Sequence, residues 1–172
     1  LHPALFYGGL LAAVRRRNSI TLAGHCRATG LARTGDGWRV TTTAGEMQAR
    51  HVVIATNGYT GSLAPKLQRR LVPIASHVIA TEELPPGLAL KLCPRDRTFS
   101  ETRRVLNYYR LSPDGKRVIF GGRARFTEID GEKRARLLHA SLVKRFPELA
   151  DVKVTHTWQG NVAFTYDALP HA

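Results

Sequence analysis

A chain of 172 residues with 43% hydrophobic side chains can form one domain of ordinary size, or parts of two, which excludes wholesale disorder. No apolar run approaches the roughly 20 residues of a membrane-spanning helix, and the start Leu1-His2-Pro3 has neither a Met nor the pattern of a signal peptide. The formal net charge of +13 would suit nucleic acid, but no basic block is interleaved with the aromatic residues of an RNA-binding sheet, so solvated faces and contacts with absent acidic parts are favoured.

The first predicted element is a helix over Pro3–Arg17. Pro3 suits the first helical position because its missing N–H costs nothing there, and Arg15–Arg17 place positive charge at the negative end of the helix dipole. Ile20–Ala23 is predicted as a short strand. The apolar face of the helix follows helical spacing and consists of Phe6, Leu10, Ala13 and Val14.

Three short strands are predicted next, over Ala28–Thr34, Trp38–Thr43 and Met47–Arg50. Gly35-Asp36-Gly37 separates the first two, since Asp-Gly supplies the positive φ that tight hairpins require. Ala44-Gly45-Glu46 turns the chain again. Two tight turns in succession predict an antiparallel meander.

The segment His51–Thr60, HVVIATNGYT, has a different pattern. Val52–Ala55 is continuously apolar, which is typical of a strand buried on both faces of a parallel sheet. This run leads directly into Thr56-Asn57-Gly58, and in open α/β sheets ligands bind outside the carboxyl ends of strands. The alternative is an ordinary buried strand followed by a loop, and the residues alone leave both interpretations open.

The next part begins with a short helical connector over Lys66–Arg70 and an extended segment over Leu71–Thr81. Val105–Leu111 and Lys116–Gly121 are predicted strands. The four residues Ser112-Pro113-Asp114-Gly115 join them and are a strong hairpin signal.

A second long helix is predicted from Asp130 or Gly131 to about Phe146, where Pro147 ends it. The last predicted strand covers Val152–Trp158. Simple alternation would place four of its side chains on one face: Val152, Val154, His156 and Trp158.

These elements predict an α/β (α+β) fold class in two parts. Residues 1–62 have the order of part of a nucleotide-binding, Rossmann-like domain that includes an antiparallel meander. Residues 63–157 predict a mainly antiparallel β-sheet with a flanking helix, and residues 158–172 predict the start of a return to the first domain. Because the chain stops inside a loop, we expect an internal piece of a longer protein.

Several pieces of the chain, taken in order, resemble one family. LHPALFYGGLLAAVRRR and GDGWRVTTTAGEMQARHVVIATNGYT resemble the middle of the D-amino-acid oxidase (DAO) type of FAD-dependent oxidoreductases. RRLVPIASHVIATEEL, RRVLNYYRLSPDGKRVIFGGR and WQGNVAFTYDALPHA are most similar to its gamma-glutamylputrescine oxidoreductase branch. The resemblance implies an FAD-binding domain over 1–62 and a substrate-binding domain over 63–157.

The same resemblance indicates what the chain lacks. The family's GxGxxG turn, which holds the flavin pyrophosphate, has no match here, and neither does its glycine-rich C-terminal FAD segment. The missing N- and C-terminal parts are therefore expected partners of this chain, and we expect these residues alone not to retain FAD.

The resemblance also implies an activity. The whole enzyme would oxidise the C–N bond of a small-molecule amine or amino acid by hydride transfer to flavin, and a hydroxy acid is the alternative substrate. His77, His139 and His156 have no partner at a helpful spacing, so the catalytic residues are unknown. The lack of a recognisable acid–base group agrees with flavin chemistry, in which the cofactor performs the difficult step.

Cofactor contacts follow from the resemblance at six positions. The strand that begins near Ala28 would contact the adenine side through its backbone, with plain packing as the alternative for Ala28 and Leu63. The turn after the apolar run would lie along the nucleotide. The implied cofactor-binding residues are Ala28, Ala55, Thr56, Asn57, Tyr59 and Leu63.

Substrate contacts are predicted in the second part. Alternation sends Tyr108 and Arg110 to one face and Tyr109 to the other, and an arginine fork fits a substrate carboxylate. A surface arginine beside core tyrosines is the alternative, and a core tryptophan is the alternative for Trp158. The candidate substrate-binding residues are Tyr109, Arg110, Arg123 and Trp158.

Two further classes of function stay open. A cofactor-free remnant or binding module of the same fold is one, and a basic nucleic-acid-binding domain is a weaker one. Cys26 and Cys93 lie far apart and the histidines are scattered, so neither a disulfide framework nor a metal site is expected. A reducing, cytoplasmic location is the plain interpretation.

Overall fold

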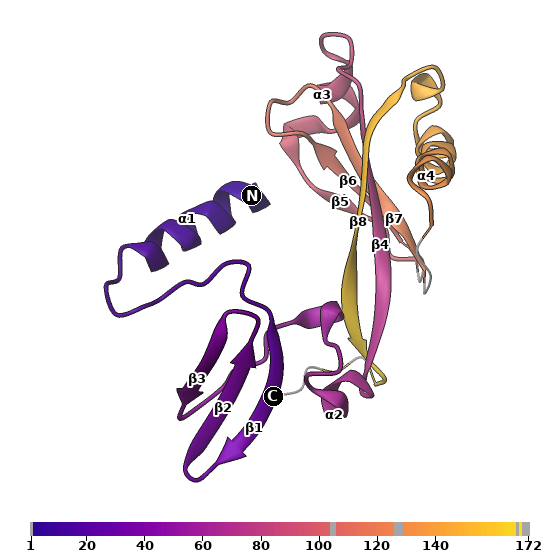
Figure 1. Ribbon diagram of the computed structural model, residues 1–172. Helices are drawn as coiled ribbons and strands as arrows, with labels where there is room; N and C mark the ends of the chain where they lie inside the picture. The colour runs from indigo at the N-terminus through magenta and orange to yellow at the C-terminus, as the bar shows by residue number, and fades with distance from the viewer. Residues whose placement is uncertain (1, 104–105, 126–128, 168, 170–172) are drawn as a thin grey trace. The chain divides into compact units, whose positions relative to one another are not determined.

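The computed structural model describes residues 2–103, 106–125, 129–167 and 169, with the side chains of 123–125 outside the description (Figure 1). The chain divides into two compact units. The smaller unit contains residues 1–55 and 61–65, and the larger contains residues 56–60 and 66–172. Each unit is described by itself below. None of the helices in the described ranges combines the length and hydropathy that crossing a membrane requires.

The smaller unit begins with helix α1, Pro3–Arg15, which confirms the predicted helix with an end two residues earlier. His2 caps it, because its Nδ1 accepts a hydrogen bond from the Leu5 backbone N–H at 3.4 Å. The apolar face does not become a buried core within this unit. Its large side chains are exposed, among them Leu5, Phe6, Tyr7 and Leu10.

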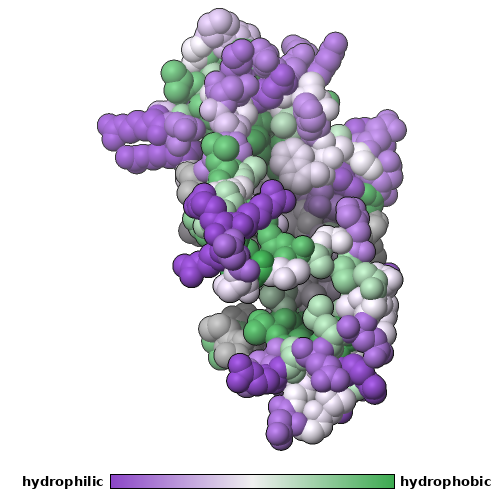
Figure 2. Space-filling view, turned by 60° about the vertical axis from the view of Figure 1, so that its left-hand side comes forward, coloured by the Kyte–Doolittle hydropathy of each residue, from purple (hydrophilic) through white to green (hydrophobic). Residues whose placement is uncertain are grey.

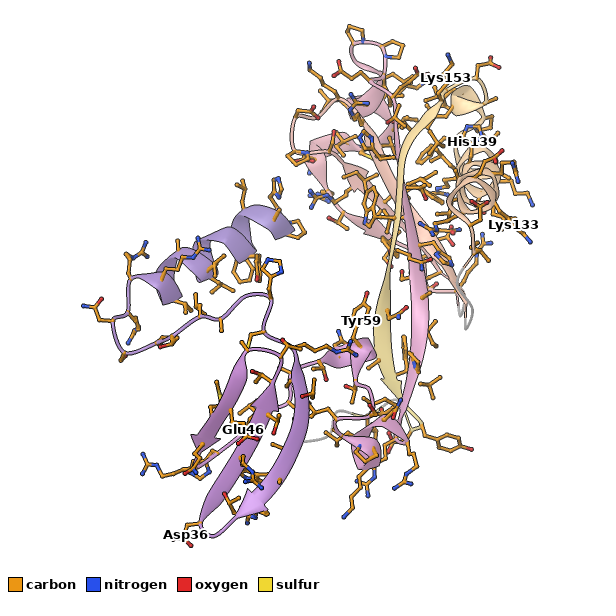
Figure 3. All side chains as sticks on the ribbon, viewed as in Figure 1. Asp36, Glu46, Tyr59, Lys133, His139 and Lys153 are labelled. Carbon is orange, nitrogen blue, oxygen red and sulfur yellow. The ribbon has the colours of Figure 1, made fainter. Side chains whose placement is uncertain are left out.

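The predicted meander is confirmed as a three-stranded antiparallel sheet in the order β1-β2-β3, with β1 Ala28–Thr34, β2 Gly37–Thr42 and β3 Gly45–Ala49. Its first turn lies at the predicted Gly35-Asp36-Gly37, but the positive φ is at Gly35, with φ 50°, and not at Asp36 or Gly37. Asp36 lies at the tip of that hairpin (Figure 3).

Two other strand predictions in this unit are wrong. Ile20–Ala23 and His51–Ala55 form neither helix nor strand, and the Val53 side chain is 88% exposed. A continuously apolar run becomes a buried parallel strand only when neighbouring strands pair with it on both sides. No strand in the described ranges pairs with His51–Ala55.

The larger unit is built on a five-stranded antiparallel sheet in the order β5-β6-β7-β4-β8. It also contains the short helices α2, Pro65–Gln68, whose first residue belongs to the smaller unit, and α3, Leu88–Leu92. Three 3-10 turns complete it: η1 Asn57–Tyr59, η2 Pro94–Asp96 and η3 Pro147–Leu149. The strands are β4 Leu71–Thr81, β5 Phe99–Ser100, β6 Asn107–Leu111, β7 Val118–Arg125 and β8 Val154–Thr165.

Helix α4, Gly131–Arg145, covers one face of this sheet. Asp130 caps it by accepting hydrogen bonds from the backbone N–H groups of Glu132 at 3.2 Å and Lys133 at 2.9 Å. Lys133 and His139 mark the helix in Figure 3. The core lies between helix and sheet and includes Ile79, Tyr109, Leu111, Val118, Phe120, Leu138, Leu142, Phe146 and Leu149.

The opposite face of the sheet is called the open face below. Strand alternation and register place on it Ser76 and Val78 of β4, Tyr108 and Arg110 of β6, Gly121 of β7, and Trp158, Gly160, Val162 and Phe164 of β8. The large side chains from β8 on this face are exposed. The space-filling view shows hydrophobic residues at the surface among hydrophilic ones (Figure 2).

Strand β8 corrects the expectation that four alternating side chains share a face. Val152 and Val154 pack against the core, whereas Trp158 pairs with Val78 on the open face. The cause is a bulge at Thr155, where the register shifts between the pairs Ala80–His156 and Thr81–Val154. One extra residue reverses the alternation of every side chain that follows.

The two units divide near the predicted boundary, since Pro65 belongs to one and residue 66 to the other. The five residues 56–60 group with the larger unit although both flanking segments group with the smaller one. Strand β8 runs to Thr165 without a break at the predicted boundary between 157 and 158. The domain limits themselves stay predictions.

Candidate functional site

Ala28 lies at the start of β1, which is an edge strand of the meander. The carbonyl of Arg27 accepts a hydrogen bond from the Thr43 N–H at 2.9 Å, so Arg27 faces the neighbouring strand. Because backbone groups alternate along an antiparallel strand, those of Ala28 turn to the outer edge. An N–H and a C=O on a free edge are the groups that adenine needs, so this position fits the predicted backbone contact.

Ala55 and Leu63 also belong to the smaller unit. Ala55 is exposed and Leu63 is half-buried. Neither side chain carries a polar atom, so any contact with a cofactor would be through backbone or by packing. The structure leaves both alternatives for Leu63 open.

Residues Thr56–Thr60 form a turn that satisfies many of its own polar groups. The hydroxyls of Thr56 and Thr60 lie 2.7 Å apart, and that of Thr60 donates to the Asn57 carbonyl at 2.8 Å. The backbone N–H of Tyr59 donates to the Thr56 carbonyl at 3.0 Å. Asn57 has a φ of 48°, a left-handed conformation that asparagine tolerates better than most residues.

Two side chains of this turn contact the outer edge of β8. The Asn57 Oδ1 accepts from the Ala163 N–H at 2.9 Å, and the Tyr59 hydroxyl oxygen accepts from the Asn161 N–H at 3.1 Å. Tyr59 is labelled beside β8 in Figure 3. The Asn57 Oδ1 and the Tyr59 hydroxyl oxygen of these two predicted cofactor residues therefore already accept hydrogen bonds from the sheet.

The open face carries a fixed tyrosine that the candidate list missed. The Tyr108 hydroxyl forms a hydrogen bond with the Ser76 Oγ at 2.8 Å. The ring reaches Ser76 across Gly121, where a Cβ would overlap it. Arg110 lies two residues along β6 and so shares this face.

The other substrate candidates are placed differently. Tyr109 is buried on the α4 side, stacked on Phe99 at 4.9 Å between ring centroids and edge-on to Phe146 at 5.1 Å. Trp158 is 44% exposed on the open face. Arg123 lies in β7, but its side chain is outside the description. Their roles stay predictions.

Alternation along β6 is the sequence signal for Tyr108, since it places Tyr108 on the same face as Arg110. No pattern in the sequence indicates that Ser76 lies near Tyr108. Its approach to Tyr108 depends on the register of three strands, which pairs Gly121 with both Tyr108 and Val78.

The structure also describes the surroundings of Cys93 and of two histidines. Burial, and secondarily the charge of Asp96, raise the pKa of Cys93 to about 11, so this thiol is protonated at neutral pH. Within the described part of the chain, no three His, Cys, Asp or Glu side chains could together hold a metal ion. The His139 and His156 rings make local contacts, with the Leu149 carbonyl at 3.3 Å and the Thr155 hydroxyl at 2.9 Å.

Comparison with known proteins decides the family. A sequence model of the family described as FAD dependent oxidoreductase (DAO) matches residues 1–172. The chain belongs to this family.

Two curated relatives agree with this assignment. The chain is 35% identical over 132 residues to gamma-glutamylputrescine oxidoreductase of Escherichia coli (strain K12), covering 76% of this chain and 31% of that protein. It is 30% identical over 170 residues to the probable oxidoreductase OrdL of Rhizobium meliloti (strain 1021), covering 99% of this chain and 39% of that protein. The chain thus spans less than half the length of these relatives.

Solved structures show the fold. Glycine oxidase from Geobacillus kaustophilus superposes with a TM-score of 0.65 at 18% identity, over 88% of this chain and 40% of that one. L-proline dehydrogenase from P. horikoshii superposes with a TM-score of 0.67 at 18% identity, over 87% of this chain and 41% of that one. The predicted fold class, mixed α/β with antiparallel sheets, is confirmed.

The residues present fit FAD in part. The free edge at Ala28 suits the adenine. The Asn57 Oδ1 and the Tyr59 hydroxyl lone pair, in contrast, are used by β8. Members of this family use FAD, and the contacts implied at the six positions stay predictions.

Proposed function

We propose that this chain is part of an FAD-dependent enzyme that oxidises the C–N bond of a small amine or amino acid. Family membership supports the cofactor. The names of its relatives, gamma-glutamylputrescine oxidoreductase and glycine oxidase, support the substrate class. When bound, FAD would supply the hydride acceptor, and the protein would supply binding and orientation.

The composition of the open face is the structural observation that best supports the proposed substrate class. Arg110 shares it with Tyr108, whose hydroxyl is fixed by Ser76. A guanidinium can pair with a carboxylate through two hydrogen bonds. The open face thus carries an arginine and a fixed phenol on β6 and the partly exposed Trp158 on β8, groups that suit a substrate with a carboxylate and an apolar chain.

The remaining residues would orient the parts of the complex. The backbone at Ala28 and the turn at Thr56–Thr60 would hold the nucleotide, with Ala55 and Leu63 along it. Trp158 would form an apolar wall that excludes water from the substrate. Hydride transfer demands no Ser–His–Asp group or carboxylate pair, and the scattered histidines are consistent with this.

A cofactor-free binding module of the same fold is the second candidate. The contacts of Asn57 and Tyr59 with β8 favour it, because both side-chain oxygens already accept hydrogen bonds from that strand. The unpaired cysteines Cys26 and Cys93 accord with a cytoplasmic location in either case.

Flavin reduction tests the proposal. In the enzyme that carries this chain, anaerobic addition of an amino acid or a gamma-glutamyl amine should bleach the flavin absorbance. Arg110→Ala should raise KM roughly 10- to 100-fold for substrates with a carboxylate, the effect of losing charged hydrogen bonds, and leave simple amines unaffected.

The matched control is Arg136→Ala, on the exposed side of α4 where Arg136 pairs with Glu132. It should leave both substrate classes unchanged. Absence of flavin reduction by every amine would overturn the activity, and an equal loss for both substrate classes in Arg110→Ala would overturn the role of Arg110.

A further inference from the structure

Strands β4 and β8 form a long antiparallel ribbon, which pairs from Leu71–Thr165 to Thr81–Val154.

Strand β8 is also the edge of the sheet, so alternate N–H groups face away from β4. An exposed edge can pair with a foreign strand. At the ribbon, two successive outward N–H groups, those of Asn161 and Ala163, have acceptors from the turn at Thr56–Thr60.

The turn matches this edge in spacing and in direction. Asn57 and Tyr59 are two residues apart, as are Asn161 and Ala163, and the pairs run in opposite order, as in an antiparallel ladder. Side-chain oxygens replace the carbonyls of a neighbouring strand. Gly58 between them must lack a Cβ, because that atom would lie 2.7 Å from the Asn161 carbonyl oxygen.

We infer that Thr56–Thr60 is a clasp that holds the outer edge of β8 at Asn161 and Ala163, and that Asn57 and Tyr59 are positioning residues for β8. This role is different from the nucleotide contacts that the family resemblance implies. Fixing β8 at Asn161 and Ala163 fixes the strand that presents Trp158 and Val162 on the open face. Only this last step depends on the proposed function.

Amide hydrogen exchange, followed by NMR on the enzyme that carries this chain, tests the clasp without substrate. Asn57→Gly removes the acceptor and keeps a residue suited to positive φ, so Ala163 should exchange roughly 3- to 10-fold faster. Tyr59→Phe should give the same acceleration at Asn161. In each variant the other amide should change less, and Phe120, in the sheet interior, should not change.

Asn57→Asp is the rescue variant, because its carboxylate can accept from the same N–H and aspartate also tolerates a left-handed φ. It should restore slow exchange at Ala163 and the indole N–H chemical shift of Trp158, which Asn57→Gly should move. Wild-type exchange at both amides in Asn57→Gly and Tyr59→Phe would overturn the clasp.

An unmoved Trp158 resonance, despite faster exchange, would overturn the positioning role. If Asn57→Gly does not fold, Tyr59→Phe and Asn57→Asp decide the question. A failure of flavin reduction would leave these results unaffected, so the clasp and the proposed function can fail separately.

Discussion

The smaller and larger units of the chain have different sources of order. In the larger unit, one helix and five strands enclose a continuous core around Ile79, Val118 and Phe120. Among the described residues of the smaller unit, Ala64 alone is buried. Its helix and meander instead follow local signals, such as the cap at His2 and the turn at Gly35. Because apolar burial is the dominant favourable term in folding, the larger unit should hold most of the stability.

Cysteine labelling gives the largest expected contrast between the units. Cys93 is fully buried in the core of the larger unit, and its pKa is raised to about 11. Two units of pKa alone reduce the reactive thiolate about 100-fold. Cys26 of the smaller unit is half-buried. With a maleimide at neutral pH, Cys26 should react at least that much faster, as followed by mass spectrometry, and equal rates would contradict the comparison.

Truncation of a core side chain is the second test. Phe120→Ala should lower the free energy of unfolding by about 3–5 kcal/mol, the usual cost of removing a buried phenylalanine. Leu10→Ala on the exposed face of α1 should change it by less than about 0.5 kcal/mol. Urea denaturation followed by circular dichroism measures both, and similar losses would show that the smaller unit is more strongly packed than its exposure indicates.

Replacing a glycine by alanine should change the stability in opposite directions in the two units. Gly121→Ala places a methyl group on the Tyr108 ring and should destabilise the larger unit by about 1–3 kcal/mol. Gly8 lies inside α1 with nothing within 4 Å of an added Cβ. Gly8→Ala should therefore favour helix by about 0.5–1 kcal/mol. Denaturation midpoints and helical circular dichroism provide the comparison, and a stabilising Gly121→Ala would contradict the ring placement.

The smallest effect concerns pH and the cap of α4. Hydrogen bonds from the backbone N–H groups of Lys133 and Glu132 lower the pKa of Asp130. The stabilisation is therefore present above the unfolded pKa of about 3.9 and is lost as pH falls through the lower folded pKa. Asp130→Asn keeps an acceptor without the charge. Its melting temperature should lie slightly below that of the parent near neutral pH, and the two should converge below pH 3.9. A constant difference between them would contradict this account.

Local signals in the sequence were sufficient for most elements. Pro3 and the helical spacing located α1, two glycine-containing turns located the meander, and Ser112–Gly115 located the β6–β7 hairpin. The same signals failed at His51–Ala55, because a run of apolar residues does not show whether strands will pair with it. They failed again at Thr155, because a bulge is set by the pairing of β8 with β4.

In the candidate site, too, sequence signals indicated some residues, whereas only the fold brought others together. Alternation along β6 separated Tyr108 and Arg110 from Tyr109, and the family resemblance identified the turn at Thr56–Thr60. The bond from Tyr108 to Ser76 joins positions 32 residues apart, and that from Tyr59 to Asn161 joins positions 102 apart. No local pattern contains such pairs.

The sequence by itself thus determined the family, the antiparallel character of both sheets and the local turns, because these depend on near neighbours and on shared motifs. The tertiary structure alone decided which side chains share the open face and which strand edge the turn at Thr56–Thr60 holds. These depend on strand register, and a shift of one residue in register exchanges the two faces of a strand.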